Sequence, residues 1–313
     1  MNANDALRGK KIERNEMLRI VRSAVMGFCS GVRLAVKAAE DALERNSFGE
    51  KKIFSLGPLI HNETVLKKFE ERGLKILDEN KIDSLDENCV VLLRAHGVAP
   101  NVLKKIKTTG AVIIDSTCPR VATSLRRVEE FSKKDGCVIL AGDAGHGEVR
   151  ALQGSAEQGG GKFVLVQNAE EAKKFANSFE SFPCENFVLL SQTTFSPDEF
   201  KKIAEALREK IPNLQVLDTI CPATQSRQKA LRDLAKKSDA IIVVGGKKSA
   251  NSRRLFELAC ELCEKSFFVE NAHEAARLLE EGGLCGAATV GITAGASTPD
   301  FLIEEVERAI CRA

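Results

Sequence analysis

The feature that most constrains this chain is a long internal repeat. The segment DSTCP at residues 115–119 recurs as DTICP at residues 218–222, an offset of 103 residues, and the apolar run CVILAG recurs at the same offset as AIIVVG. A third, looser copy places Cys29 of GFCSGV 89 residues before the cysteine of DSTCP. Because repeated sequence implies repeated structure, we expect three related units rather than one irregular domain.

Each unit contains four short apolar runs separated by amphipathic stretches. Buried strands that alternate with helices predict an α/β fold of three pseudo-repeated domains, each with a short, mainly parallel sheet. The predicted domains are residues 17–112, 113–214 and 215–313, preceded by an N-terminal extension of residues 1–16. The expected strands are residues 19–25, 52–56, 74–77, 89–95, 111–115, 137–141, 162–166, 186–191, 214–218, 240–244, 266–270 and 288–293.

Three cysteines, Cys29, Cys118 and Cys221, each stand where a predicted strand ends and a helix begins. Pro119 and Pro222 suit the first helical position, which places the preceding cysteines at helix N-caps, where the helix dipole favours a thiolate. Cysteine can also cap a helix without binding a ligand, but three in register indicate a shared site. Thiolates select zinc or iron-sulfur clusters, and no fourth cysteine is in register. Zinc could take a histidine as its fourth ligand, whereas an iron-sulfur cluster could leave one iron open to substrate.

Two further sets of polar residues follow strand ends, which is where ligands bind in parallel α/β sheets. The first set comprises three pairs, His61 with Glu63, His146 with Glu148, and Ser249 with Asn251. The second set follows the last strand of each unit and comprises His96, Thr193 and Ser297. Imidazoles, hydroxyls and an amide beside glycine-rich loops predict a phosphate or diphosphate ligand.

One acid in these sets has a credible catalytic role. Glu148 is expected to hold its proton more tightly than usual, because it would lie near thiolates and a bound diphosphate. Glu63 is expected to be a surface residue of a helix. His273, at the start of a surface-type helix, is expected to be solvated and outside the site.

Composition argues against several classes of function. With 46 basic and 44 acidic side chains the net charge is +2, and the chain has no Trp or Tyr, so neither charge nor aromatic stacking indicates nucleic-acid binding. No apolar run approaches the ~20 residues of a spanning helix, and the first residues lack the apolar stretch of a signal peptide. We therefore expect a cytoplasmic protein with no membrane partner, whose cysteines are reduced.

Nine motifs in order connect the chain to a known family: GFCSGV, GPLIHN, AHGV, DSTCP, AGHGEV, SQTT, the Cys221 segment, SANS and TAGAS. From about Met17 to the C-terminus, this order resembles the 4-hydroxy-3-methylbut-2-enyl diphosphate reductases of the non-mevalonate isoprenoid pathway. The resemblance implies three domains arranged as a trefoil around one 4Fe-4S cluster per chain.

The resemblance also implies roles for individual residues. The implied cluster ligands are Cys29, Cys118 and Cys221; the implied diphosphate-binding residues are His61, His96, His146, Ser249, Asn251 and Ser297; the implied catalytic residues are Glu148, Thr193 and His146. The implied reaction is reductive dehydroxylation of the allylic diphosphate to isopentenyl and dimethylallyl diphosphate, with the substrate hydroxyl on the open iron and Glu148 helping to protonate the departing oxygen. An external ferredoxin or flavodoxin would supply the electrons, because the sequence has no flavin or nicotinamide motif.

The chain departs from the family's usual pattern at two positions. Ala250 stands where serine is frequent, which could remove a hydrogen bond worth roughly 1.5–3 kcal/mol to the diphosphate. Gly147 stands where proline is common, which could loosen the loop that carries Glu148. The alternative function is a non-catalytic phosphate-binding or zinc-stabilised α/β protein on the same scaffold.

Overall fold

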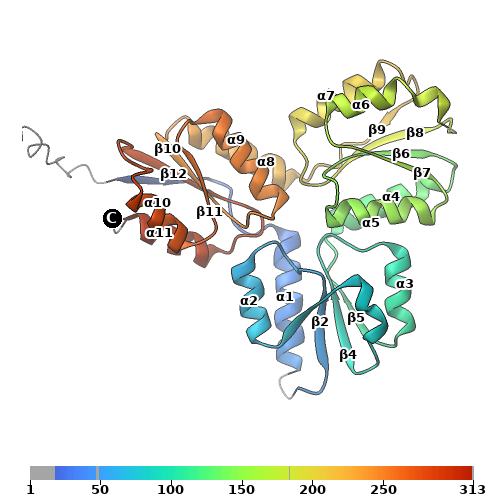
Figure 1. Cartoon of the computed structure of the whole chain (residues 1–313), viewed down its shortest axis with the longest axis horizontal. Coiled ribbons are helices and arrows are strands. Elements are labelled where there is room, and N and C mark those ends of the chain that lie inside the picture. Colours follow the sequence, from blue (N-terminus) through green and yellow to red (C-terminus); the bar gives the residue numbers. More distant parts are fainter. Residues whose placement is uncertain (1–17, 47–48, 183, 312–313) are drawn as a thin grey trace, which may run out of the picture.

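The computed structural model describes residues 18–46, 49–182 and 184–311. They form three α/β lobes arranged around a common centre, with each sheet covered by helices (Figure 1). The predicted fold class of three pseudo-repeated α/β domains is therefore confirmed. The predicted extension of residues 1–16 lies outside the described residues.

The first lobe contains a four-stranded sheet in the order β3-β2-β4-β5, and every neighbouring pair is parallel. Its elements are α1 (Ser30–Arg45), β2 (Lys52–Leu56), α2 (Glu63–Glu71), β3 (Leu74–Leu77), the 3-10 helix η1 (Glu79–Ser84), β4 (Cys89–Leu93), α3 (Pro100–Thr108) and β5 (Val112–Asp115).

The second lobe repeats this plan with the parallel order β7-β6-β8-β9. Its elements are α4 (Pro119–Ser132), β6 (Cys137–Ala141), α5 (Gly147–Gln158), β7 (Lys162–Val166), α6 (Ala169–Ala176), the 3-10 helix η2 (Phe179–Ser181), β8 (Phe187–Ser191), α7 (Pro197–Arg208) and β9 (Gln215–Val216).

The third lobe has the parallel order β1-β12-β10-β11. Counted from its other edge, as β11-β10-β12-β1, this order corresponds strand by strand to those of the first two lobes. Its elements are β1 (Arg19–Arg22), α8 (Pro222–Ala235), β10 (Ala240–Val244), α9 (Ala250–Leu262), β11 (Ser266–Val269), α10 (Ala272–Glu280), β12 (Thr289–Ala294) and α11 (Asp300–Cys311).

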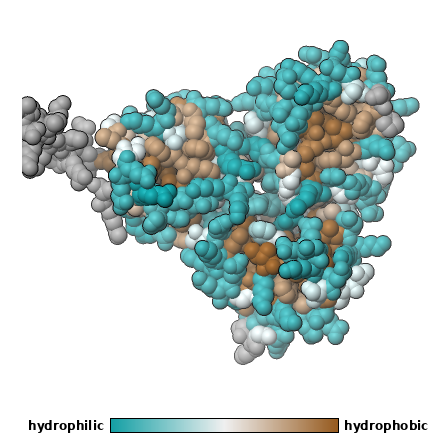
Figure 2. All heavy atoms as spheres, in the orientation of Figure 1, coloured by the Kyte–Doolittle hydropathy of each residue, from teal (hydrophilic) through white to brown (hydrophobic). Residues whose placement is uncertain are grey.

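Each sheet is buried on both faces, which is why its central strands read as continuous apolar runs. In β6, Ile139 packs into one apolar cluster and Leu140 into another, and Ile241 and Ile242 of β10 divide in the same way. Figure 2 shows a separate apolar region in each lobe, surrounded by hydrophilic side chains. Within the described part of the chain, no helix combines the length and the apolarity needed to cross a bilayer.

The grouping of strands differs from the sequence prediction in one respect. The sequence pattern groups the strand before each cysteine with the unit that follows it, so the segments 19–25, 111–115 and 214–218 are expected to belong to the units 17–112, 113–214 and 215–313 respectively. Instead, β1 pairs with β12, β5 with β4, and β9 with β8, so each of these strands completes the sheet of the neighbouring lobe. Apolar periodicity identifies a strand but does not say which sheet edge supplies its hydrogen bonds. Each cysteine therefore lies at a junction between lobes.

The N-terminal strand closes the ring of lobes, and a proline scan tests this. The N–H groups of Arg19 and Ser23 donate to carbonyl groups at residues 288 and 292, so the N–H of Val21, midway between them, faces β12 as well. Val21→Pro removes that donor and should lower the free energy of unfolding by about 1–3 kcal/mol. Hydrogen exchange measured by mass spectrometry should show lost protection in β12.

Ile20→Pro is the matched control for this experiment, because Ile20 is also partly buried but its N–H faces the open edge of the sheet. It should have the smaller effect on β12. Loss of protection in β2 and β4 instead would assign the strand to the first lobe and contradict this closure.

Candidate functional site

A central cavity is lined by residues from all three lobes. Its lining includes the three predicted cysteines and the predicted polar residues His61, His96, His146, Thr193, Ser249, Asn251 and Ser297. Glu148 does not line the cavity, but its carboxylate accepts a hydrogen bond from the hydroxyl of Thr193, which does line it. Every residue predicted for the site is thus brought to one place.

The three cysteines are N-caps of the helices that open the lobes, as predicted: Cys29 for α1, Cys118 for α4 and Cys221 for α8. Their backbone N–H groups donate to the preceding lobe, to the carbonyls of Ala296 at 3.0 Å, Ala95 at 3.0 Å and Thr193 at 2.8 Å respectively. Each cysteine therefore connects two lobes: it begins a helix of one lobe, and its backbone N–H donates a hydrogen bond to the other.

The cysteine side chains lie close to one another in the cavity. A Cβ added at Gly31 would stand 2.7 Å from the Sγ of Cys118, so the bare backbone of α1 lets this thiol approach Cys29. Burial raises the pKa of the Cys118 thiol, and the neighbouring charges of Cys29 and Cys221 act in the same direction. Three thiolates held this close require compensating positive charge.

A buried arginine provides such a charge. Arg227 of α8 is only 3% exposed, and its guanidinium donates to the carbonyl of Gly27 at 2.5 Å and to that of Ala223 at 3.0 Å. These carbonyls lie two residues before Cys29 and two residues after Cys221, so Arg227 ties two cysteine segments together. Its Nε is buried and has no hydrogen-bond partner among the described residues. Sequence reasoning missed Arg227, because a lone arginine in an amphipathic helix reads as a surface residue.

The loops after β4, β8 and β12 form the same turn, which corrects the register of one predicted set. In each turn the fourth N–H donates to the first carbonyl, and the turns span residues 94–97, 192–195 and 295–298. The residues at the third position are His96, Thr194 and Ser297, all of which line the cavity. Thr194, rather than Thr193, is thus the counterpart of the other two. The signal was present in the sequence, because Thr194 precedes Ser297 by the repeat offset of 103 residues.

The helices after β6 and β10 begin at predicted site residues. His146 is the N-cap of α5, and Ser249 is the N-cap of α9, where its side chain accepts a hydrogen bond from the N–H of Ser252. In the first lobe the N-cap is Asn62, so Glu63 occupies the exposed first helical position and pairs with Lys248 at 2.9 Å. The prediction that Glu63 is a surface residue is confirmed. His273 is likewise exposed, in the first turn of α10.

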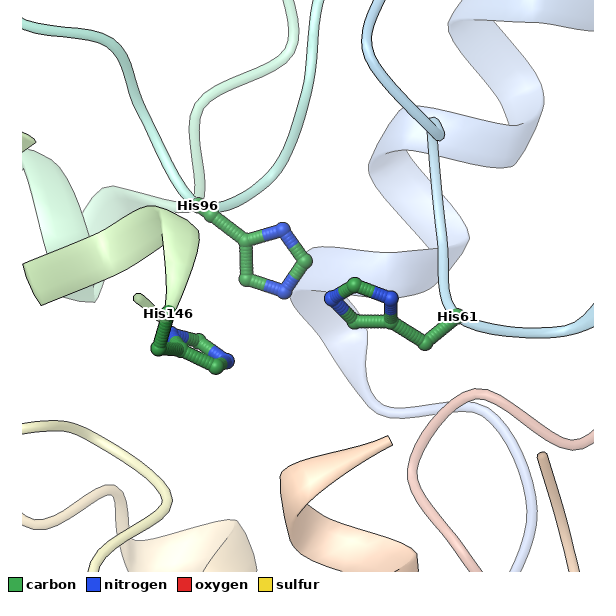
Figure 3. Close-up of side chains that lie close together, drawn as sticks. All are labelled: His61, His96 and His146. Atoms are coloured by element: carbon green, nitrogen blue, oxygen red, sulfur yellow. The ribbon is translucent and has the colours of Figure 1, made fainter. Parts of the chain in front are cut away.

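Three histidine rings meet at one side of the cavity (Figure 3). Their ring centroids lie 4.8 Å apart for His61 and His96, 5.1 Å for His96 and His146, and 6.0 Å for His61 and His146. Burial, followed by the charge of the neighbouring ring, lowers the pKa of His146 to about 4 and holds that of His96 well below its usual range. The rings are therefore neutral at pH 7, and an arriving anion would favour their protonation.

The histidines and the cysteines differ in what they could bind. Among the described residues, the three imidazoles form the only group of His, Cys, Asp and Glu donors near enough to share a single ion, with all ligand atoms within 4.8 Å of one another. The three thiols do not form such a group. The cysteines instead offer three soft sulfur ligands, the type that zinc and iron-sulfur clusters select.

Glu148 and Thr193 form a buried pair beside the cavity. The Glu148 carboxylate, 1% exposed, accepts hydrogen bonds from the Thr193 N–H at 2.8 Å and from the Thr193 hydroxyl at 2.7 Å. Burial raises the pKa of Glu148 to about 7, although the bonds from Thr193 and the charge of Arg254 oppose that shift. The carboxyl group is thus poised to give or take a proton near neutral pH, and the Thr193 hydroxyl connects it to the cavity.

The two unusual positions, Ala250 and Gly147, begin the helices α9 and α5. Ala250 is 2% exposed and lines the cavity with a methyl group, so it offers no donor to a ligand. A Cβ at Gly147 would stand 3.3 Å from the guanidinium carbon of Arg94. The bare glycine therefore leaves room for a buried arginine.

The chain matches known proteins over nearly its whole length. The family model described as LytB protein matches residues 20–311. A 4-hydroxy-3-methylbut-2-enyl diphosphate reductase of Treponema denticola is 39% identical over 293 residues, covering 93% of this chain and 98% of the relative. The enzyme of the same name from Clostridioides difficile is 37% identical over 291 residues, covering 92% and 97%.

Solved structures agree with this relationship. A structure of (E)-4-hydroxy-3-methyl-but-2-enyl diphosphate reductase, the terminal enzyme of the non-mevalonate pathway, superimposes with a TM-score of 0.68 at 32% identity, covering 95% of this chain and all of that one. The Plasmodium falciparum reductase gives a TM-score of 0.82 at 26% identity, covering 93% and 87%. The chain therefore belongs to the LytB protein family, as its nine motifs predicted.

Proposed function

We propose that this chain is a 4-hydroxy-3-methylbut-2-enyl diphosphate reductase that forms isopentenyl and dimethylallyl diphosphate. One observation carries the proposal: a thiol from each of three lobes, a cluster of neutral histidines and a proton-holding carboxyl group border one cavity. The family relationship supports the same activity.

The donor set fits a 4Fe-4S cluster held by Cys29, Cys118 and Cys221. Three N-cap thiols, with the buried Arg227 charge between two of their segments, provide soft anionic ligands and partial charge compensation. A bound cluster supplies single electrons and one iron without a protein ligand. An external one-electron donor, a ferredoxin or a flavodoxin in the cytoplasm, would deliver the electrons to it.

The chain's own residues bind the substrate and move the proton. The imidazoles of His61, His96 and His146 would hold the diphosphate, together with Ser249, Asn251, Ser297 and Thr194. The reaction breaks the allylic C–O bond, consumes two electrons and two protons, and releases water. Glu148 would give one proton to the departing oxygen through the Thr193 hydroxyl, since that hydroxyl is the one that joins the carboxyl group to the cavity.

The cysteine assignment is tested by metal analysis. Cys29→Ala, Cys118→Ala and Cys221→Ala should each lose most of the iron, the acid-labile sulfide and the visible absorption of anaerobically purified protein. The absence of Trp and Tyr leaves the charge-transfer bands of iron thiolates prominent. Cys260→Ala, at an exposed cysteine, is the matched control and should retain all three signals. Stoichiometric zinc without iron in the unsubstituted protein would favour the zinc-stabilised alternative instead.

The proton-donor role of Glu148 is tested by steady-state kinetics. Glu148→Gln should lower kcat by about 10²–10⁴-fold, the usual contribution of a positioned general acid, while the visible spectrum and the KM for the allylic diphosphate change little. Glu63→Gln, in an exposed acid of the first lobe, should leave kcat unchanged. An unchanged kcat in Glu148→Gln would exclude this role.

The raised pKa of Glu148 also predicts a pH dependence of stability. The folded pKa of about 7 lies above the ordinary value of 4.5, so the folded state binds the proton more tightly between these limits. The contribution is complete below pH 4.5 and is lost as the pH rises through 7, a loss of about 3 kcal/mol at most. The unfolding free energies of unsubstituted and Glu148→Gln protein, compared at equal cluster content, should diverge by this amount across that range. Parallel curves would show that Glu148 is not perturbed.

A further inference from the structure

A second pocket borders the three histidines and shares no other lining residue with the cavity of the cysteines. This outer pocket has a volume of about 290 Å³, compared with about 90 Å³ for the cavity of the cysteines. Four cationic side chains line it: Arg94, Arg150, Lys248 and Arg253. It has room for a diphosphate group.

The charge of the outer pocket is strongly one-sided. Its only acidic lining residue, Asp143, is already paired with Arg254 through bonds of 2.6 and 2.9 Å. Arg150 and Arg253 are exposed and form no ion pair within the described part of the chain. Lys248 pairs with Glu63, but both side chains are largely exposed, so that pair is weak. An anion would find several uncompensated positive charges here.

Arg94 adds a buried donor to these exposed cations. It is 7% exposed, and its guanidinium bonds to Glu79 at 3.1 Å while its Nε is buried without a partner among the described residues. Added Cβ atoms at Gly57 and Gly147 would stand 2.6 and 3.3 Å from this guanidinium, so two bare backbone segments confine it. Burial is the main cause of the lowered pKa of His61 and His96, and the charge of Arg94 acts on both rings in the same direction.

We infer that the outer pocket is an anion vestibule, which receives the diphosphate end of the arriving substrate and delivers it to the three histidines. This inference rests on the proposed function for the identity of the substrate. A cleft with one sign of charge raises the local concentration of an oppositely charged ligand and its association rate. Because the three rings border both spaces, an anion in the vestibule already touches the groups that hold it in the cavity.

The vestibule is tested by removing its two unpaired exposed charges. R150Q/R253Q should lower kcat/KM for the allylic diphosphate about 10-fold at low salt with kcat nearly unchanged, because the charges act on association. The dependence of kcat/KM on ionic strength should also become shallower, since fewer charges remain to be screened.

The matched control is R126Q/R127Q, which removes two exposed arginines of α4 that line neither pocket. It should behave like the unsubstituted enzyme. The inference is overturned if R150Q/R253Q matches this control in kcat/KM and in salt dependence. It is also overturned if kcat falls as much as kcat/KM, since the arginines would then act during the reaction.

A readout independent of turnover separates this inference from the proposed function. If the unsubstituted protein does not reduce the allylic diphosphate, the proposed function fails. The vestibule is then tested by calorimetry, which measures the binding of inorganic diphosphate to each variant. Weaker and less salt-dependent binding in R150Q/R253Q than in R126Q/R127Q would support an anion vestibule. Equal binding in the two variants would overturn it.

Discussion

Three backbone hydrogen bonds hold the rest of this structure in register. In each, the N–H of a cysteine donates to the carbonyl of a residue in the turn that ends the preceding lobe's functional loop. The same cysteine is the N-cap residue of the helix that begins the next lobe, and at Cys29 the thiol also accepts a hydrogen bond from the N–H of Val32. One residue thus fixes the position of two lobes and of one thiol, so a shift of any lobe would move a cysteine relative to the other two. The three-lobed shape and the convergence of the thiols have a common cause.

Desolvation dominates the electrostatics of the centre. It lowers the pKa of the histidines and raises that of Glu148, so these groups are held neutral or close to it where water is excluded. The buried arginines Arg94 and Arg227 keep their charge, one beside the histidines and one beside the cysteines. Positive charge is therefore present on both sides of the centre, and the same burial raises the pKa of Glu148.

Much of the fold could be predicted, because the same order of strands and helices occurs three times along the sequence. The predicted segments 52–56, 74–77, 137–141, 162–166 and 240–244 coincide with β2, β3, β6, β7 and β10. The strands next to the cysteines were also found, but their partners were not, since an edge strand forms the same apolar pattern whichever sheet it joins. The turn register of Thr194 could have been derived from the offset, whereas Arg227 and Arg94 could not, because their burial depends on residues far away in the chain.

The sequence by itself determined the class of the fold, the family, and the residue types that meet at the centre, since strand patterns, N-capping prolines and repeat spacing are local properties. Only the tertiary structure decided which sheet each junction strand completes and which side chains lose their water. Hydrogen-bond partners of a strand edge and the desolvation of a carboxyl group or a guanidinium are set by segments distant in sequence. The neutral histidines, the raised pKa of Glu148 and the cationic outer pocket are therefore properties of the assembled lobes.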